Sequence, residues 1–402
     1  MKIKISRPIT LLSSIATAFL LSACGGGGDS TTTTTSITGQ LVDNYVADVN
    51  YSCADGAAGV TDDKGTFKCA KLPVKFQIEG LILGEIDTLP ADKQVFPQDL
   101  LHLKREDINH SDVIAMARFL QSCDEDNDTK NGIKIDKKVR ETFKHHNEEF
   151  NPEDVESYAA EAEITLIDEE EAVTHLEHTT EFTQELTQTA LPEPLKDTLL
   201  TPASTLTQEA KDTLSYMGNE ERLAHDVYLE LYNYHLQNSN TAIKQLNNIA
   251  TKSEVTHIQT VQALINKYEL DYSSFTNIDL PELGYKETAI EDMEMGKYDI
   301  QKIQELHDLL IAKGEQSVQD ALEVGCMVEV TDIDDLLVEI PIAQDSNASD
   351  VVAAFEFLRD GSYSHYWAFD KGLKNMGIDE GCCSLGQEYC HPEYPTDTKG
   401  RR

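Results

Sequence analysis

Positive charge is scarce in this sequence. Its 402 residues include 33 lysines and arginines against 72 aspartates and glutamates, which leaves a formal net charge of −39 at pH 7. Such a surface repels nucleic acid and anionic membranes and attracts cations, so nucleic-acid binding is excluded. Tryptophan is almost absent too, and we assign the single one, Trp367, to packing. The hydrophobic content of 40% is that of a globular protein, and the length suffices for two or three domains.

The apolar run near the N-terminus, residues 9–21, is too short to span a bilayer with margin. Basic residues precede it, so we expect a signal peptide over residues 1–23. The run closes with the letters LSAC, which resemble the bacterial lipobox. This resemblance implies cleavage before Cys24 and stable anchoring through three acyl chains such as palmitate. Gly25, where an aspartate would favour the inner membrane, favours the outer membrane of a bacterial cell envelope. The alternative is an ordinary cleaved signal peptide with an incidental cysteine.

Seven further cysteines follow Cys24, and export would place them in an oxidising compartment. We expect Cys53 to pair with Cys69. The other five are odd in number, so one thiol is free or paired in a way that the sequence leaves open. Three of the five fall in a tail, residues 379–402, where a disulfide is favoured over a zinc site because no second close pair accompanies them. The five are Cys123, Cys326, Cys382, Cys383 and Cys390.

Short alternating apolar runs follow a low-complexity flexible tether, residues 24–36. They occupy residues 37–90 and predict strands joined by turns. Cys53 and Cys69 flank a hairpin-type turn at 62–65, so their disulfide would hold together a sheet too small to be stable alone. The segment resembles the small β-sandwich modules found near the N-terminus of bacterial surface lipoproteins.

Residues 91–150 are predicted as a helical extension with an acidic loop. Asp124, Asp126 and Asp128 alternate as oxygen ligands do at the start of an EF-hand calcium loop. The glycine and the closing glutamate of that loop are missing, so a calcium site and a solvated acidic turn remain as alternatives. Residues 151–204, rich in glutamate, threonine and proline, are predicted as an acidic linker.

Residues 205–378 carry four apolar seams that step by three and four residues, the spacing of helices packed in a bundle. Each seam is interrupted by polar residues. The first, for example, runs from Met217 through Glu221 and Ala224 to Tyr228 and Leu231. The interrupting residues are Glu221 in the first helix, Glu254 and His257 in the second, Glu329 and Asp332 in the third, and Ser362 and His365 in the last.

One buried carboxylate or histidine is usually a satisfied structural residue, but four helices that each place a potential ligand on the core face are different. Uncompensated buried carboxylates cost several kcal/mol each, and two divalent cations would neutralise them directly. The residues i and i+3 of Glu254-x-x-His257 lie on one helix face, where both can reach the same pair of metals.

This region resembles the ferritin-like superfamily, and more closely an uncharacterised bacterial branch of it, over about 170 residues. The spacing Glu221-x-x-Ala-x-x-x-Tyr matches the first helix of rubrerythrin-type proteins, and Glu254-x-x-His257 matches the second. The resemblance implies an all-α ferritin-like four-helix bundle and two bound iron or manganese ions. It makes Glu254 a bridging ligand and Glu221, His257, Glu329 and His365 further ligands.

The sequence departs from the superfamily pattern in the last helix, where Ser362 stands in place of a glutamate. We expect Asp332, one turn after Glu329, to supply the missing carboxylate. Glu220 competes with Glu221 for the first position, and the seam spacing favours Glu221. Tyr228 is assigned to the core in preference to a hydrogen-bonding role.

The neighbours His225 and Asp226 are expected on the solvated face. The predicted function is a di-iron oxidoreductase of ferroxidase type that uses O₂ or peroxide. The competing interpretations are a non-catalytic binding module with a degenerate bundle and a metal storage or sensing module.

Overall fold

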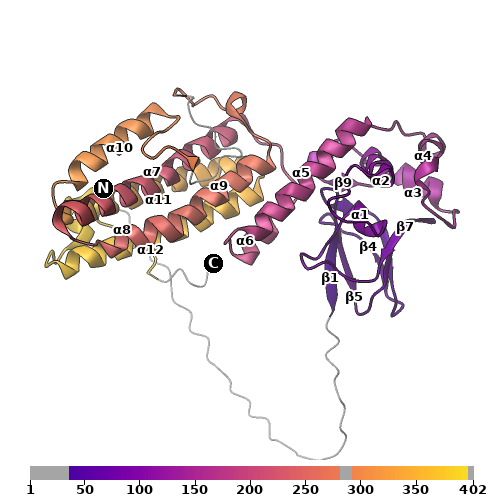
Figure 1. Cartoon of the computed structure of the whole chain (residues 1–402), viewed down its shortest axis with the longest axis horizontal. Coiled ribbons are helices and arrows are strands. Elements are labelled where there is room, and N and C mark those ends of the chain that lie inside the picture. Colours follow the sequence, from indigo (N-terminus) through magenta and orange to yellow (C-terminus); the bar gives the residue numbers. More distant parts are fainter. Residues whose placement is uncertain (1–35, 281–291, 397–402) are drawn as a thin grey trace, which may run out of the picture. The chain divides into compact units, whose positions relative to one another are not determined.

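The computed structural model describes residues 36–280 and 292–396. The expected signal peptide, Cys24 and all of the tether except Ser36 lie outside the described residues. Along the chain, a β-rich N-terminal region precedes a helical C-terminal region (Figure 1). Within the described ranges, we find no helix with the length and apolar character needed to cross a membrane.

The strands of the N-terminal region form three sheets. A five-stranded sheet has the order β10-β7-β6-β3-β4, a three-stranded sheet the order β5-β1-β8, and β2 pairs with β9. Neighbouring strands are antiparallel except for β1 with β8, β2 with β9, and β7 with β10. The strands are β1 (Ile37–Leu41), β2 (Val46–Ala47), β3 (Asn50–Cys53), β4 (Ala58–Val60), β5 (Thr66–Cys69), β6 (Val74–Ile78), β7 (Leu81–Ile86), β8 (Gln94–Val95), β9 (Ile133–Lys134) and β10 (Glu148–Glu149).

Period-two alternation builds the core of this region. Val74, Phe76 and Ile78 of β6 are buried, while the two residues between them are half-exposed. Phe67 of β5 packs edge-on against Phe76, with ring centroids 5.0 Å apart. The expected disulfide, Cys53–Cys69, joins β3 of one sheet to β5 of another. By chain entropy, a bridge that closes a loop of this size contributes about 3 kcal/mol.

Residues 91–150 were predicted as a helical extension, but they also contain three strands, β8 to β10, which pair with strands of the three sheets. Each of the three has only two residues, which is too short for an alternating pattern to be visible in the sequence. The helices of this stretch are α1 (Pro97–Leu100), α2 (Ser111–Ser122) and α3 (Lys137–Phe143).

The predicted acidic linker is helical over much of its length. It holds α4 (Val155–Ala162), α5 (Glu169–Gln188) and α6 (Glu193–Leu199). Asp168 caps α5 by accepting a hydrogen bond from the amide of Glu170. The buried residues of α5, among them Ala172, Leu176 and Leu186, form a sparse apolar face. The composition of the segment did not indicate this face because glutamate and threonine are far more frequent.

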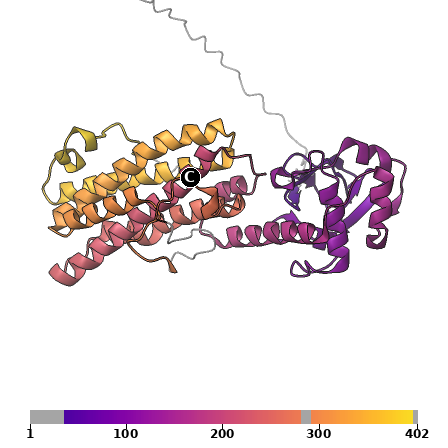
Figure 2. The same cartoon turned by 90° about the horizontal axis from the view of Figure 1, so that it is seen from above.

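Four helices of the C-terminal region, α7, α9, α11 and α12, lie side by side (Figure 1), and the same arrangement is visible from above in Figure 2. A short connection, residues 346–348, joins α11 to α12. Helix α10 packs on α7 and α11. The elements of this region are α7 (Gln208–Ser239), α8 (Lys244–Asn248), a π-helical turn η3 (Ile249–Glu254), α9 (Val255–Lys267), α10 (Gln301–Gly314), α11 (Val318–Asp345) and α12 (Ser349–Asn375).

The side chains between these helices form two apolar clusters with a polar layer between them. One cluster contains Leu231 and Phe369. The other contains Met217, Leu336 and Phe355. Because the polar layer is enclosed by apolar packing on both sides, water has little access to it.

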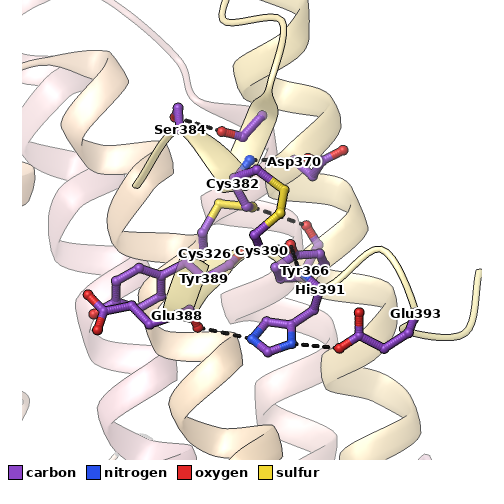
Figure 3. The surroundings of a disulfide bond; sticks show 12 residues. Cys326, Tyr366, Asp370, Cys382, Ser384, Glu388, Tyr389, Cys390, His391 and Glu393 are labelled. Atoms are coloured by element: carbon purple, nitrogen blue, oxygen red, sulfur yellow. Dashed lines mark hydrogen bonds and ion pairs between the residues drawn. A yellow bond between two sulfur atoms is a disulfide. The ribbon is translucent and has the colours of Figure 1, made fainter. Parts of the chain in front are cut away.

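The segment after α12 is held down by cystines (Figure 3). Cys382 is bonded to Cys326 of α11, and Cys383 is bonded to Cys390. Cys123 is the free cysteine of the described part, and it is buried. The half-buried indole of Trp367 donates a hydrogen bond to the carbonyl of Pro395, so this residue also anchors the tail.

Candidate metal centre

Five side chains from the four helices meet in the polar layer. None is more than 6% exposed to solvent. The sequence predicted all five as ligands. They are Glu221 of α7, Glu254 at the end of the π-helical turn, His257 of α9, Glu329 of α11 and His365 of α12.

Glu254 lies between the two imidazoles. Its Oε2 is 3.2 Å from Nδ1 of His257, and its Oε1 is 3.1 Å from Nδ1 of His365. One carboxylate therefore contacts both histidines, with one oxygen for each. The π-helical turn that ends at Glu254 is a feature often found at functional sites.

Each imidazole also faces a second carboxylate. Nδ1 of His257 is 3.0 Å from Oε2 of Glu221, and Nδ1 of His365 is 3.4 Å from Oε2 of Glu329. The site thus consists of two groups that share Glu254, and the ligand atoms of each group lie within 4.8 Å of one another. The centroids of the two imidazole rings are 5.5 Å apart.

These spacings fit metal coordination. Two ligand atoms bound at about 2.1 Å to one cation, at right angles to each other, are about 3 Å apart. Two buried atoms of the site, Oε1 of Glu221 and Nδ1 of His365, have no hydrogen-bond partner within the described structure, although Nδ1 lies close to two carboxylates. A cation held between the groups would supply the missing partner.

The charge of the cluster supports the same conclusion. Four buried carboxylates, Glu221, Glu254, Glu329 and Asp332, face two imidazoles. Even with both imidazoles protonated, two negative charges would remain in an apolar surrounding, at a cost of several kcal/mol each. With neutral imidazoles, as metal ligation requires, the four carboxylates carry four negative charges, and two divalent cations would balance them.

Comparison with known proteins places the same segment in a family. A family model described as an uncharacterized protein domain, DUF2202, matches residues 210–390. The uncharacterized protein MJ0754 of Methanocaldococcus jannaschii is 35% identical over 176 residues, which cover 44% of this chain and 81% of that protein. The chain belongs to the DUF2202 family.

A solved structure of the hypothetical protein MJ0754 is also similar, with 31% identity and a TM-score of 0.35. The match covers 47% of this chain and 87% of the other. Since the DUF2202 segment spans residues 210–390, it contains all five side chains of the site and Asp332.

The ionisable groups of the DUF2202 site shift one another's pKa values. Burial raises the pKa of Glu221 and of Glu329 to about 7, although the nearest imidazole works against it in each case. Burial would also raise the pKa of Glu254, but His365 and His257 together lower it below its ordinary value. Burial would lower the pKa of His365, but Glu329 and Glu254 raise it to about 9. Since metal ligands must be deprotonated, metal affinity is expected to fall with decreasing pH.

Asp332 lies beside the site and outside both compact groups. Ser362 donates a hydrogen bond of 2.5 Å to its Oδ2, and its buried Oδ1 has no partner within the described structure. Burial raises the pKa of Asp332, and Glu221 is the charge that raises it most. The shorter side chain of Ser362 thus leaves room for Asp332, whose free oxygen remains available on the Glu221 side.

Two hydroxyl groups lie within hydrogen-bond distance of side chains of the site. The hydroxyl of Tyr228 donates to Oε1 of Glu329 at 2.5 Å, so our preference for a purely apolar role of this tyrosine was wrong. Oγ of Ser253 lies 2.6 Å from Nε2 of His365. With the proton on Nε2 and shared with Ser253, Nδ1 keeps its lone pair for a metal. Sequence reasoning missed Ser253 because it lies outside the seams.

Gly361 makes room for His257. A Cβ atom at position 361 would lie 2.4 Å from Nε2 of His257, closer than real Cβ contacts allow. The glycine stands inside α12, where it weakens the helix. Its place is therefore explained by the imidazole that packs against it.

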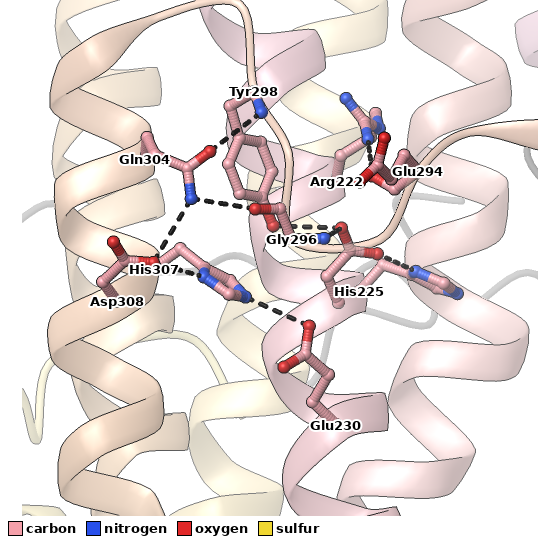
Figure 4. A network of polar contacts seen from close by, with 10 residues as sticks. Arg222, His225, Glu230, Glu294, Gly296, Tyr298, Gln304, His307 and Asp308 are labelled. Atoms are coloured by element: carbon pink, nitrogen blue, oxygen red, sulfur yellow. Dashed lines mark hydrogen bonds and ion pairs between the residues drawn. The ribbon is translucent and has the colours of Figure 1, made fainter.

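His225 and Asp226 were expected on the solvated face, and for Asp226 this was wrong. Figure 4 labels its neighbours His225, Gly296 and Tyr298. Asp226 is 5% exposed. Its Oδ2 accepts hydrogen bonds from the amide of Gly296 and the hydroxyl of Tyr298, and its Oδ1 lies 2.8 Å from Nδ1 of His225. Gly296 and Tyr298 come from a segment some 70 residues away, which the helix periodicity could not reveal.

The proposed calcium ligands have other partners. The two groups of side chains in the described ranges that could hold a metal ion do not include Asp124, Asp126 or Asp128. Oxygens of Asp124 and Asp126 each accept the amide of Asp128 at 3.0 Å, and Asp124 also accepts the amide of Lys134. The structure thus uses these carboxylates to close the turn.

Proposed function

We propose that residues 205–378 form a ferritin-like four-helix bundle that binds two iron ions and works as an oxidoreductase of ferroxidase type. The observation that carries the proposal is the position of Glu254, whose two oxygens each contact one imidazole. A carboxylate shared by two ligand groups is what a pair of metal ions requires. Carboxylate and imidazole ligands suit iron and manganese.

The residues around the ligands prepare the site. Tyr228 occupies Oε1 of Glu329 and so leaves Oε2 for the centre. Ser253 orients the ring of His365, and Gly361 admits the ring of His257. The apolar clusters above and below the polar layer exclude water, which strengthens every electrostatic interaction within it. Bound iron would supply electrons to O₂ or peroxide.

The experiment measures metal and oxygen in turn. The full chain is freed of metal, loaded anaerobically with Fe(II), and then exposed to O₂ in a closed electrode chamber. We expect two ions per chain and consumption of O₂ in proportion to the bound iron. The double variant Glu254→Ala, His257→Ala should bind no iron in the site.

A control removes another Glu–His pair of the same region, with a buried histidine and a half-exposed glutamate. Glu230 of α7 and His307 of α10 lie 3.2 Å apart, outside the ligand groups. The variant Glu230→Ala, His307→Ala should keep both ions. Equal iron in the site variant and the wild type, or none in the wild type, would refute the proposal.

Metal storage or sensing without turnover is the second candidate, and the serine at position 362 favours it. The pattern of the superfamily places a glutamate there, and Asp332, which accepts a hydrogen bond from Ser362, lies outside both ligand groups. Two bound ions without O₂ consumption would decide for this candidate.

For localisation we propose a lipid anchor at Cys24, supported by the LSAC motif after the apolar run. Cells that express the chain and are fed labelled palmitate should label the wild type and leave Cys24→Ser unlabelled. Equal labelling of the two proteins would exclude the anchor.

A further inference from the structure

A row of carboxylates continues from the centre toward the protein surface. On α11, Asp332, Asp335 and Glu339 are spaced by three and four residues, which places them on one face of the helix over about 10 Å. Asp332 is buried at 4% exposure, whereas Asp335 and Glu339 are half-exposed. The row therefore leads from the solvent to the side chain that stands beside Glu221.

Glu220 of α7 faces this row, and packing does not explain it. It is 2% exposed, no donor group in the described ranges reaches either of its carboxylate oxygens, and the side chain beside it is another carboxyl group, that of Asp335. The charged groups that act on it most strongly are Asp332, Asp335 and Glu221, all of them carboxylates. A structural carboxylate at such a depth normally has an arginine, a lysine or main-chain amides around it.

The outer end of the row is held by a tyrosine and a lysine. The hydroxyl of Tyr216 donates to Oδ2 of Asp335 at 2.7 Å. The exposed Lys302 of α10 donates to the same hydroxyl at 3.1 Å, and its ammonium group lies 5.3 Å from the tyrosine ring. A single positive charge thus stands at the mouth of a row of negative ones.

We propose that Glu220, Asp335 and Asp332 form an uptake site, which attracts a divalent cation such as Fe(II) or Mn(II) from the solvent and passes it to the ligands around Glu254. Their oxygens do not converge as those of the two ligand groups do, so the cation passes along them in succession. This inference rests on the proposed metal centre, since it names the path by which that centre is filled. The site has oxygen ligands alone, whereas the centre adds two imidazole nitrogens, which bind transition metals more strongly. A cation is therefore held weakly outside and firmly inside.

The rate of metal uptake tests the inference. Metal-free full chain is mixed with Co(II) in a stopped-flow instrument, and the visible absorption of cobalt reports arrival at the imidazoles. Asp335→Asn should take up cobalt about tenfold more slowly than the wild type and still bind two ions at equilibrium, because the loss concerns electrostatic attraction along the path. Its control is Asp334→Asn, which removes the same charge from the adjacent, exposed position and should leave the rate unchanged.

Two further variants make the test two-sided. Glu220→Gln should slow uptake at least as much as Asp335→Asn. Lys302→Gln should speed uptake about twofold, because it removes the positive charge at the mouth. If Asp335→Asn matched Asp334→Asn while the wild type bound two ions, the uptake site would be refuted and the metal centre kept. A wild type that binds no cobalt would refute both.

Discussion

The acidic loop at residues 124–131 and the core of the helical region are both built around carboxylates, and their oxygens meet different partners. In the loop, oxygens of Asp124 and Asp126 accept main-chain amides and the side chain of Asn131. In the helical core, Oε1 of Glu221, Oδ1 of Asp332 and both oxygens of Glu220 are buried without a partner in the described part of the chain.

The difference separates two uses of acidic residues that look alike in a sequence. A carboxylate that closes a turn is satisfied by the amides it captures. A carboxylate packed between helices has few amides within reach, because the helices use theirs internally, and so each oxygen needs a hydroxyl, a proton or a cation. Density of acidic residues therefore says less about metal binding than their position in the local structure.

Loss of Glu254 should have the largest effect of the changes that test this difference between the acidic loop and the helical core. Glu254→Ala should release both metal ions, with affinity reduced at least a hundredfold, because both ligand groups share this side chain. Asp126→Ala should change tightly bound metal by nothing measurable. Mass spectrometry of metals in the dialysed full chain gives the number of ions. Retention of one or both ions by Glu254→Ala would contradict the shared-ligand arrangement.

Removal of the metal ions with a chelator compares the stability of the helical region with that of the N-terminal region. Removal of the ions should destabilise the helical region by about 3 kcal/mol or more, as expected for a ligand present at a hundred times its dissociation constant. The N-terminal region should keep its stability. Hydrogen exchange with and without a chelator resolves the two regions, and equal changes in both would contradict the assignment.

A smaller change isolates one of the two ligand groups. Gly361→Ala should displace His257 and release the ion on its side, while the ion held by Glu329 and His365 remains. The overpacking should also cost about 1–3 kcal/mol in stability. Metal counting and thermal unfolding measure the two effects.

Gly372→Ala on the same helix is the control for that variant. Its Cβ would meet the flexible end of Gln245 at 2.9 Å, so this side chain can move away. If Gly372→Ala released as much metal as Gly361→Ala, the effect would belong to the helix and not to His257.

The last effect, which depends on pH, concerns a buried carboxylate of the N-terminal region, Asp43. One of its oxygens accepts a hydrogen bond from Gln121, and burial raises its pKa from about 3.8 to about 7 in spite of that bond. The folded protein then keeps a proton that the unfolded chain releases, so Asp43 makes stability fall as the pH rises from about 4 to about 7. Asp43→Asn has no carboxyl group to titrate at this position. Its free energy of unfolding should therefore increasingly exceed that of the wild type as the pH rises through that window. The difference should level off above pH 7, at about 4 kcal/mol at most.

His175 is the titratable group that faces Asp43, and burial lowers its pKa to about 4. Its own contribution has the opposite sign, because stability is lost as the pH falls below about 6.5. Since both proteins contain His175, the difference between them reports Asp43. Urea unfolding from pH 4 to pH 8 measures it, and a gain that does not change with pH would contradict the assigned protonation.

The sequence was sufficient for the helical seams and for the five side chains that meet between the helices, because polar residues that interrupt an apolar three-and-four pattern lie on the buried face. It was insufficient where the partner is distant or the element is short. Asp226 is buried by Gly296 and Tyr298, and the two-residue strands β8 to β10 have no period to detect. Gly361 and Ser253 support histidines from other helices, which only the packed structure reveals.

The central claim is that two ions share Glu254. X-ray absorption spectroscopy of the iron-loaded full chain tests it most directly, because a pair of ions in such a site is separated by about 3.5–4 Å and scatters measurably. We predict an iron–iron distance in this range, with oxygen and nitrogen neighbours, that disappears in Glu254→Ala. A spectrum of isolated iron ions in the wild type, or the same iron–iron distance in the variant, would contradict the account.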